Sequence, residues 1–262
     1  MCIRDRVITE HYSAEFWQEE QGLQNLLSAL TAEGVTWSQR REHVYSDDEL
    51  MMAPLLAMSV TTAPRGYGGP SYGTEYDLSQ ACARCGSGAV QVSPLVLRSS
   101  QIPKTGSLFL TLDFDFLFGQ RLKELLAAED FRGLELRQAR AAKSQNALPW
   151  FQLLPRATLP PMAAETKGIV RENPCPQCGR DGYFNDSEAP LEIVYRAEQI
   201  ESDGLPDIVA TYELFGYSAL REVFTDSHFA RPLVLIKPRV WAVLPRDAKK
   251  RLRFEPVTAK PA

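Results

Sequence analysis

Two copies of the string CxxCG restrict the fold of this chain more than any other feature, CARCG at 82–86 and CPQCG at 175–179. The two intervening residues let both thiolates of a pair face one metal ion, and the following glycine permits the positive φ that such a turn needs. Two such turns complete a tetrahedral shell with Zn–S distances of about 2.3 Å. We therefore predict one zinc ion held by Cys82, Cys85, Cys175 and Cys178.

The separation of the two pairs differs from that of an ordinary zinc ribbon. Roughly ninety residues lie between Cys85 and Cys175, whereas ordinary ribbons place about 15–20 residues between their pairs. Both ends of this long segment must return to the metal. We therefore expect an inserted substructure whose base is clamped by a split Cys₄ zinc ribbon.

Three other roles for the cysteines stay open at this point. A redox CxxC usually begins a helix, which lowers the thiol pKa, but neither pair precedes a clear helical pattern. Disulfides are disfavoured in the cytoplasm, and a degenerate site that has lost its metal is the third alternative. Zinc is favoured over all three. Because four cysteine ligands leave no position for water or substrate, we expect the site to be structural and not catalytic.

The composition is that of a globular protein. The chain has 262 residues, of which 44% are hydrophobic, and a formal net charge of -4. A protein that wraps nucleic acid usually carries a strong basic excess, so nucleic acid is a disfavoured partner. No apolar run approaches the roughly 18 residues that cross a bilayer, and no signal peptide opens the chain. We expect a cytoplasmic protein without a membrane segment.

We divide the sequence into four segments. Residues 1–6 match the translation of a common sequencing adapter, so we interpret them as an adapter-derived artefact and expect them to have no part in the fold. Residues 7–73 are expected to form an α/β extension that ends in a Gly/Pro-rich loop. Residues 74–244 form the expected double-CxxCG domain. Residues 245–262 are charged and contain proline, which predicts a flexible tail.

Hydrophobic spacing predicts an α+β fold of mixed sheets with a few flanking helices. The predicted helices begin at Ser13 (ending near Gly34), Ser46, Gln120 and Ser218. The predicted strands lie at 90–97, 107–112, 134–137, 149–154, 191–196, 208–214 and 233–244, the last broken by Pro238. The strings LKELL at 122–126 and LREVF at 220–224 each follow a CxxCG by about forty residues. We interpret them as two similar strand–helix–strand units.

Other residue types give little sign of catalysis. The sequence holds no HExxH, GxSxG or phosphate-binding GxxxxGK[ST] motif, and we assign no catalytic residue and predict no enzyme. Asp113 and Asp115 alternate around Phe114 and could form a carboxylate pair, but we expect them at a solvated strand edge.

The two strings and their long separation resemble the double-CXXCG motif proteins, many of them from myxobacteria. The resemblance covers roughly residues 74–244. It also includes the order of elements and the predicted helix at 218–225 before a last β-like stretch. Some members are described as immunity proteins that protect a bacterial cell from a toxin delivered by neighbouring kin. The resemblance implies a non-enzymatic protein that binds a cognate toxin directly. The chain departs from the family pattern in its N-terminal extension and in continuing past the last strand.

Two alternatives to the toxin-binding hypothesis remain. A zinc-ribbon nucleic-acid-binding or regulatory protein requires a contiguous basic surface near the cysteines. An enzyme with a site assembled from scattered residues requires a deep polar pocket. The sequence does not name the partner, the binding face or the oligomeric state.

Overall fold

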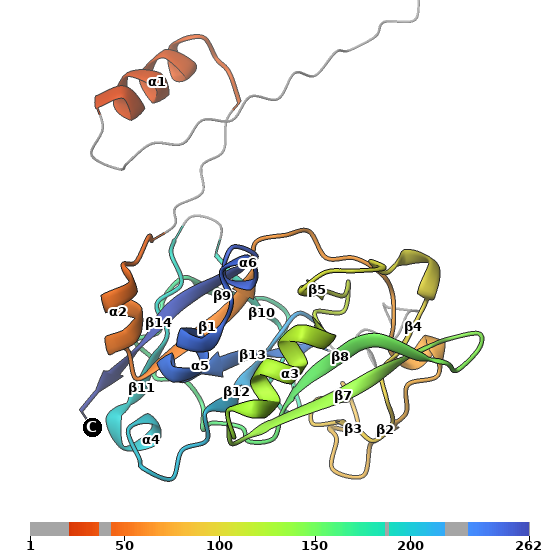
Figure 1. The fold of residues 1–262 in the computed structure, drawn as a ribbon. Coiled ribbons are helices and arrows are strands. Elements are labelled where there is room, and N and C mark those ends of the chain that lie inside the picture. The colour runs from red at the N-terminus through yellow and green to blue at the C-terminus, as the bar shows by residue number, and fades with distance from the viewer. Residues whose placement is uncertain (1–20, 37–42, 187–188, 218–229, 262) are drawn as a thin grey trace, which may run out of the picture. The chain divides into compact units, whose positions relative to one another are not determined.

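The computed structural model describes residues 21–36, 43–186, 189–217 and 230–261 (Figure 1). The chain divides into two compact units, residues 1–40 and 41–262. The first unit contains helix α1 (Gln21–Ala32), which buries none of its residues. Gly34 follows it with φ of 64°, and the Val35 N–H donates to the Leu30 carbonyl at 3.0 Å. This is the glycine-ended helix that the sequence predicts, over its described part.

A seven-stranded sheet is the frame of the second unit. Its strand order is β11-β14-β1-β13-β12-β10-β9, with parallel pairing only at β11–β14 and β12–β10. The strands are β1 (Leu55–Val60), β9 (Ile169–Arg171), β10 (Tyr183–Asn185), β11 (Val194–Arg196), β12 (Ile208–Phe215), β13 (Arg231–Ile236) and β14 (Leu252–Lys260).

A five-stranded sheet of order β4-β7-β8-β6-β5 forms the second layer. Its strands are β4 (Val96–Leu97), β5 (Leu108–Leu110), β6 (Phe116–Gly119), β7 (Leu134–Ala141) and β8 (Ala147–Pro155). All five lie between the two cysteine pairs in sequence. This sheet is therefore the inserted substructure that the cysteine spacing predicts. A two-stranded ribbon, β2 (Tyr76–Asp77) and β3 (Val90–Gln91), precedes it.

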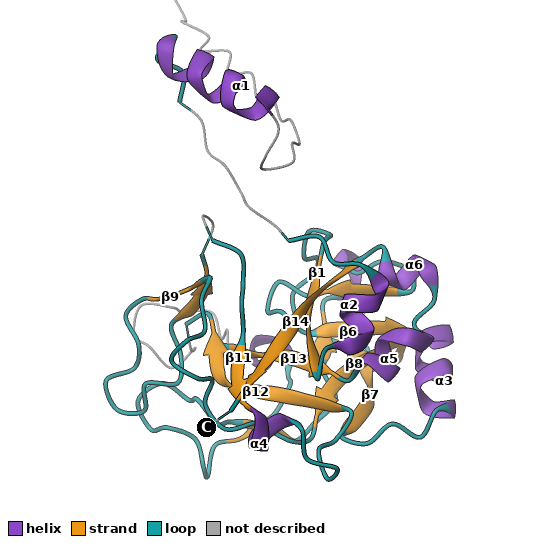
Figure 2. Cartoon of the chain, turned by 90° about the vertical axis from the view of Figure 1, so that its left-hand side faces the viewer, coloured by secondary structure: helices purple, strands orange, loops and turns teal. Residues whose placement is uncertain are grey.

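Short helices complete the second unit. They are α2 (Asp47–Met52), α3 (Gln120–Ala128), α4 (Ala197–Ile200), α5 (Pro238–Val243) and α6 (Arg246–Lys249), with 3₁₀ turns at Pro70–Tyr72 and Ser99–Gln101. Helix α2 follows Ser46, where the sequence predicts a helix start, and has a capping box in which Ser46 and Glu49 each accept the other's backbone N–H. Helices α2 and α3 both contact α5, and Figure 2 shows the three on the same side of the strands. None of the described helices combines the length and apolar character that a membrane crossing requires.

The two faces of the large sheet bury separate cores. Along β1, Leu56 and Met58 point into a core shared with the five-stranded sheet and with α2, α3 and α5. Their neighbours Leu55 and Ala57 point into a second core with β11 and the segment around Leu159, because side chains alternate across a strand. The sheets thus meet face to face through the first core.

Two of the predicted boundaries are wrong. The expected flexible tail, over its described residues 245–261, is folded: it contains α6 and β14, and β14 pairs with β1 along six residues. Leu252 and Phe254 of this strand are buried. Because charged residues lie between and beside them, the sequence pattern did not indicate a strand. Residues 7–73 are not a separate extension either, because β1 lies inside the seven-stranded sheet and the division falls between residues 40 and 41.

Two further sequence predictions differ from the structure. The stretch 233–244 is a strand only as far as Ile236, because Pro238 occupies the first turn of α5, where its missing N–H costs nothing. The helix expected at 218–225 lies outside the described residues. The strands beside the two repeat strings pair differently, since β6 and β7 flank β8 whereas β12 and β13 pair directly. The described residues therefore show no common topology for the two predicted strand–helix–strand units.

Candidate metal centre

Each cysteine pair lies in the loop of an antiparallel hairpin. Cys82 and Cys85 lie between β2 and β3, and Cys175 and Cys178 lie between β9 and β10. The first hairpin precedes the five-stranded sheet, and the second belongs to the seven-stranded sheet. A shared ion would therefore join parts of the chain that are far apart in sequence.

The two loops have the same turn geometry. In the first knuckle (82–86), the Gly86 N–H donates to the Cys82 carbonyl at 2.8 Å, and in the second knuckle (175–179) Gly179 donates to Cys175 at 2.8 Å. Both glycines have positive φ, 76° and 64°. A non-glycine residue at such an angle is strained, which explains why glycine follows each pair. No helix begins at either knuckle, as the sequence predicts.

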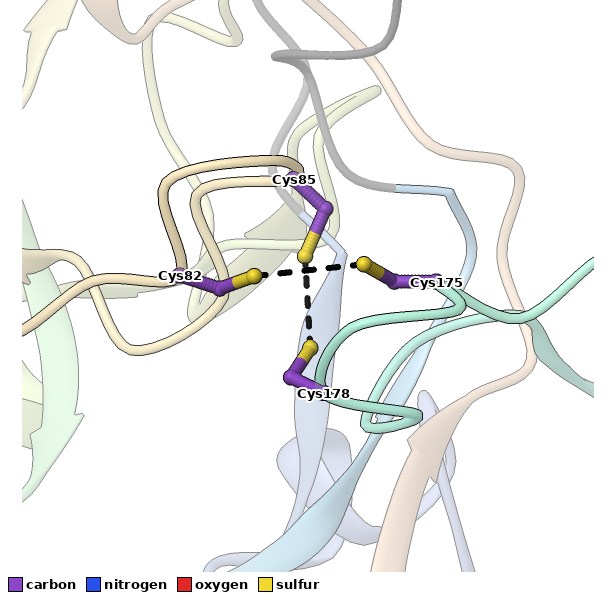
Figure 3. A group of neighbouring side chains, drawn as sticks. All are labelled: Cys82, Cys85, Cys175 and Cys178. Carbon is purple, nitrogen blue, oxygen red and sulfur yellow. Dashed lines mark hydrogen bonds between the residues drawn. The ribbon is translucent and has the colours of Figure 1, made fainter.

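Figure 3 shows the four sulfur atoms converging on one point. The Sγ–Sγ distance is 3.9 Å between Cys82 and Cys175 and 3.4 Å between Cys85 and Cys178. All four lie within 4.8 Å of one another. A tetrahedral tetrathiolate site with metal–sulfur bonds of about 2.3 Å has sulfur–sulfur distances of about 3.8 Å. The four cysteines are thus positioned to bind a metal ion, and each thiol is free of a disulfide.

A second layer of polar groups supports the knuckles. The Cys175 N–H donates to Asp181 Oδ1 at 2.7 Å, and the Asp181 side chain is fully buried. The Cys85 Sγ lies 3.1 Å from the Ser87 hydroxyl, and the Cys82 N–H donates to the Ser87 carbonyl at 2.9 Å. Partners of this kind fix the orientation of metal ligands. Sequence reasoning missed Asp181, although its place three residues after Cys178 marks it as a neighbour of the knuckle.

The thiols differ in acidity without an ion. Burial raises the pKa of the Cys85 thiol to about 12. Burial also acts to raise the pKa of Cys175, but the backbone N–H groups of Cys178 and Gln177 outweigh it and lower that pKa to about 7. Thiolates are the metal-binding form, so metal binding at this site must displace protons.

The structure places Asp113 and Asp115 in the interior and not at a solvated edge, so that expectation is wrong. They are 4% and 6% exposed. Asp115 lies 3.3 Å from the Arg231 guanidinium and accepts from Gln152 at 3.0 Å. Arg231 comes from β13, 116 residues away, so no local sequence pattern predicts this ion pair.

Comparison with protein-family models, with curated proteins and with solved structures found no match.

Proposed function

We propose that the chain is a non-enzymatic, zinc-stabilised binding protein of the bacterial cytoplasm, which neutralises a cognate toxin by direct binding. The observation that carries the zinc part is the convergence of four thiols on two matched knuckles. Soft thiolate ligands in a tetrahedral set suit Zn²⁺. Four protein ligands leave no open coordination position, so the ion stabilises the fold and performs no chemistry.

The toxin part of the proposal rests on the resemblance of the two CxxCG strings to the double-CXXCG motif proteins. Its mechanism is stoichiometric occlusion, in which the zinc-clamped sheets present a fixed surface that covers the toxin. A fixed surface lowers the entropic cost of association. The zinc would then act on binding only by keeping that surface in place.

The test begins with the genes beside the coding sequence. A candidate toxin encoded there is co-expressed with the chain in a sensitive host, and we expect growth to be rescued by the wild type and lost with Cys175→Ser. Calorimetry on the purified pair should give one chain per toxin. Absence of both rescue and complex formation would contradict the proposal. Salt-dependent retardation of nucleic acid in a gel-shift series would favour the nucleic-acid alternative instead.

A further inference from the structure

A cavity of about 420 Å³ lies between the facing sides of the two large sheets. Its walls come from β6, β8, β12 and β13, and residues 86–89 of the first hairpin loop close one side. Small-molecule sites usually have volumes of about 300–1,000 Å³. The cavity is therefore large enough for a ligand of metabolite size. None of the four cysteines lines it, although Ser87, which contacts Cys85, does.

A buried polar network lines this cavity. The Arg231 guanidinium lies 3.3 Å from Asp115 and donates to the Tyr76 hydroxyl at 3.1 Å. Gln152 donates to Asp115 at 3.0 Å and exchanges two amide hydrogen bonds with Gln91, at 2.8 and 2.9 Å. These side chains come from all three sheets. A few convergent polar groups beside a well-formed cavity are typical of a ligand-binding site.

The charged groups that face the cavity are mostly cationic. The residues that line it include one carboxylate, Asp115, and four arginines, Arg137, Arg156, Arg180 and Arg231, of which Arg231 forms an ion pair with Asp115. Glu135 forms ion pairs with two of the four, Arg137 and Arg156, without lining the cavity. The Arg180 guanidinium donates to the Tyr212 carbonyl and lies 4.3 Å from the Tyr212 ring centroid.

Two more carboxyls lie near these arginines without lining the cavity. Asp113 acts electrostatically on Arg231, and Glu213 acts on Arg180. Burial raises the pKa of Glu213, which favours its uncharged form. Of these carboxyls only Asp115 lines the cavity, whereas all four arginines line it, and guanidiniums bind carboxylates and phosphates in bidentate geometry.

The edge of the cavity is apolar and aromatic. Phe114 and Val90 line it while remaining 57% and 53% exposed. Phe114 has φ of 63°, a left-handed angle that is strained for a bulky residue. Such strain persists where the surrounding structure imposes it, and it is concentrated at functional sites. Leu153 and Val234 extend the apolar surface inward.

We propose that this cavity binds a small organic anion, namely a carboxylate or phosphate carried on an apolar or aromatic body. The acid group pairs with the Arg180 guanidinium, and the body packs against Phe114. This activity goes beyond toxin binding and stands or falls independently of it.

The test is calorimetry on the metal-loaded protein with 3-phenylpropionate and phenyl phosphate, and with 3-phenylpropan-1-ol as the uncharged analogue. We expect saturable binding of at least one acid, and the stronger of the two identifies the acid group. The alcohol should bind about tenfold more weakly or not at all, because a charge-assisted pair is lost. Arg180→Gln should weaken acid binding about tenfold, and Arg251→Gln, an exposed arginine in the turn before β14, should leave it unchanged.

A methyl NMR titration of the wild type keeps the test decisive if Arg180→Gln does not fold. The acids should shift the methyl signals of Leu153 and Val234. Equal affinity for acid and alcohol, absence of saturable binding by either acid, or shifts confined to other methyls would overturn the proposal.

Discussion

At the scale of single residues, the metal centre depends on groups that do not touch the metal. Asp181 is fully buried and holds the backbone of Cys175 by a 2.7 Å hydrogen bond. The ordinary sequence signature of a zinc site contains only the cysteines, so this support becomes visible only once the second knuckle is folded.

We therefore expect Asp181→Ala to weaken zinc affinity about 10- to 100-fold, which is the usual effect of losing a group that orients a metal ligand. Competition against a chromophoric chelator measures the change. Asp203→Ala removes an exposed aspartate and serves as the matched control. Equal affinities of the two variants would show that Asp181 does not support the site.

A second buried aspartate connects elements that the sequence separates. Asp207 accepts hydrogen bonds from the Arg132 backbone N–H at 2.8 Å and from Nε and Nη2 of Arg239 at 2.7 and 2.6 Å. The hydrogen bonds from Arg239 lower the pKa of Asp207 in the folded state. A lowered folded pKa stabilises the protein above the unfolded value of about 3.9, and this stabilisation disappears as the pH falls through the folded pKa.

Asp207→Asn should therefore reduce the free energy of unfolding by about 2 kcal/mol at pH 7. The difference from the wild type should narrow as the pH falls below about 4. Urea unfolding at a series of pH values measures this, with Asp203→Asn as the exposed control. A difference that is independent of pH would exclude the ionised carboxylate as its source.

At the scale of elements, β14 shows where sequence reasoning failed. Residues 252–260 contain buried Leu252, Phe254 and Val257 between charged or polar neighbours, an arrangement that also occurs in loops. Only pairing with β1 on one side and β11 on the other decides between strand and tail. Helix α3 and the capped start of α2 were predictable because their signals are local.

Phe254→Ala should cost about 3–5 kcal/mol, as expected for a phenylalanine removed from a packed core. Thr258→Ala, on an exposed position of the same strand, should change stability by about 0.5 kcal/mol or less. Chemical unfolding of both variants provides the measurement. A cost for Phe254→Ala no larger than that for Thr258→Ala would mean that β14 is not part of the core.

At the scale of the whole molecule, the cysteine spacing predicted both the metal ligands and the existence of an insertion between them. It did not predict that the insertion is a five-stranded sheet packed on a seven-stranded one, because that arrangement depends on distant pairings such as β4 with β7 and β1 with β13. The cavity, which is formed only when the sheets meet, was equally inaccessible from the sequence.

If zinc joins the two hairpins, its removal should loosen them before the cores. We expect a chelator to lower the midpoint of thermal unfolding and to speed amide hydrogen exchange at 76–91 and 169–185, while β1 and β13 remain protected. The Cys175→Ser variant should start from the lower midpoint and respond no further to chelator. Uniform exchange before and after chelation would argue against a local clamp.

The most direct measurement of the central claim is zinc K-edge X-ray absorption on the protein as purified, together with elemental analysis. The account predicts one zinc per chain with four sulfur neighbours at about 2.3 Å. A chain that contains no zinc, or a zinc shell with nitrogen or oxygen in place of any sulfur, would contradict it.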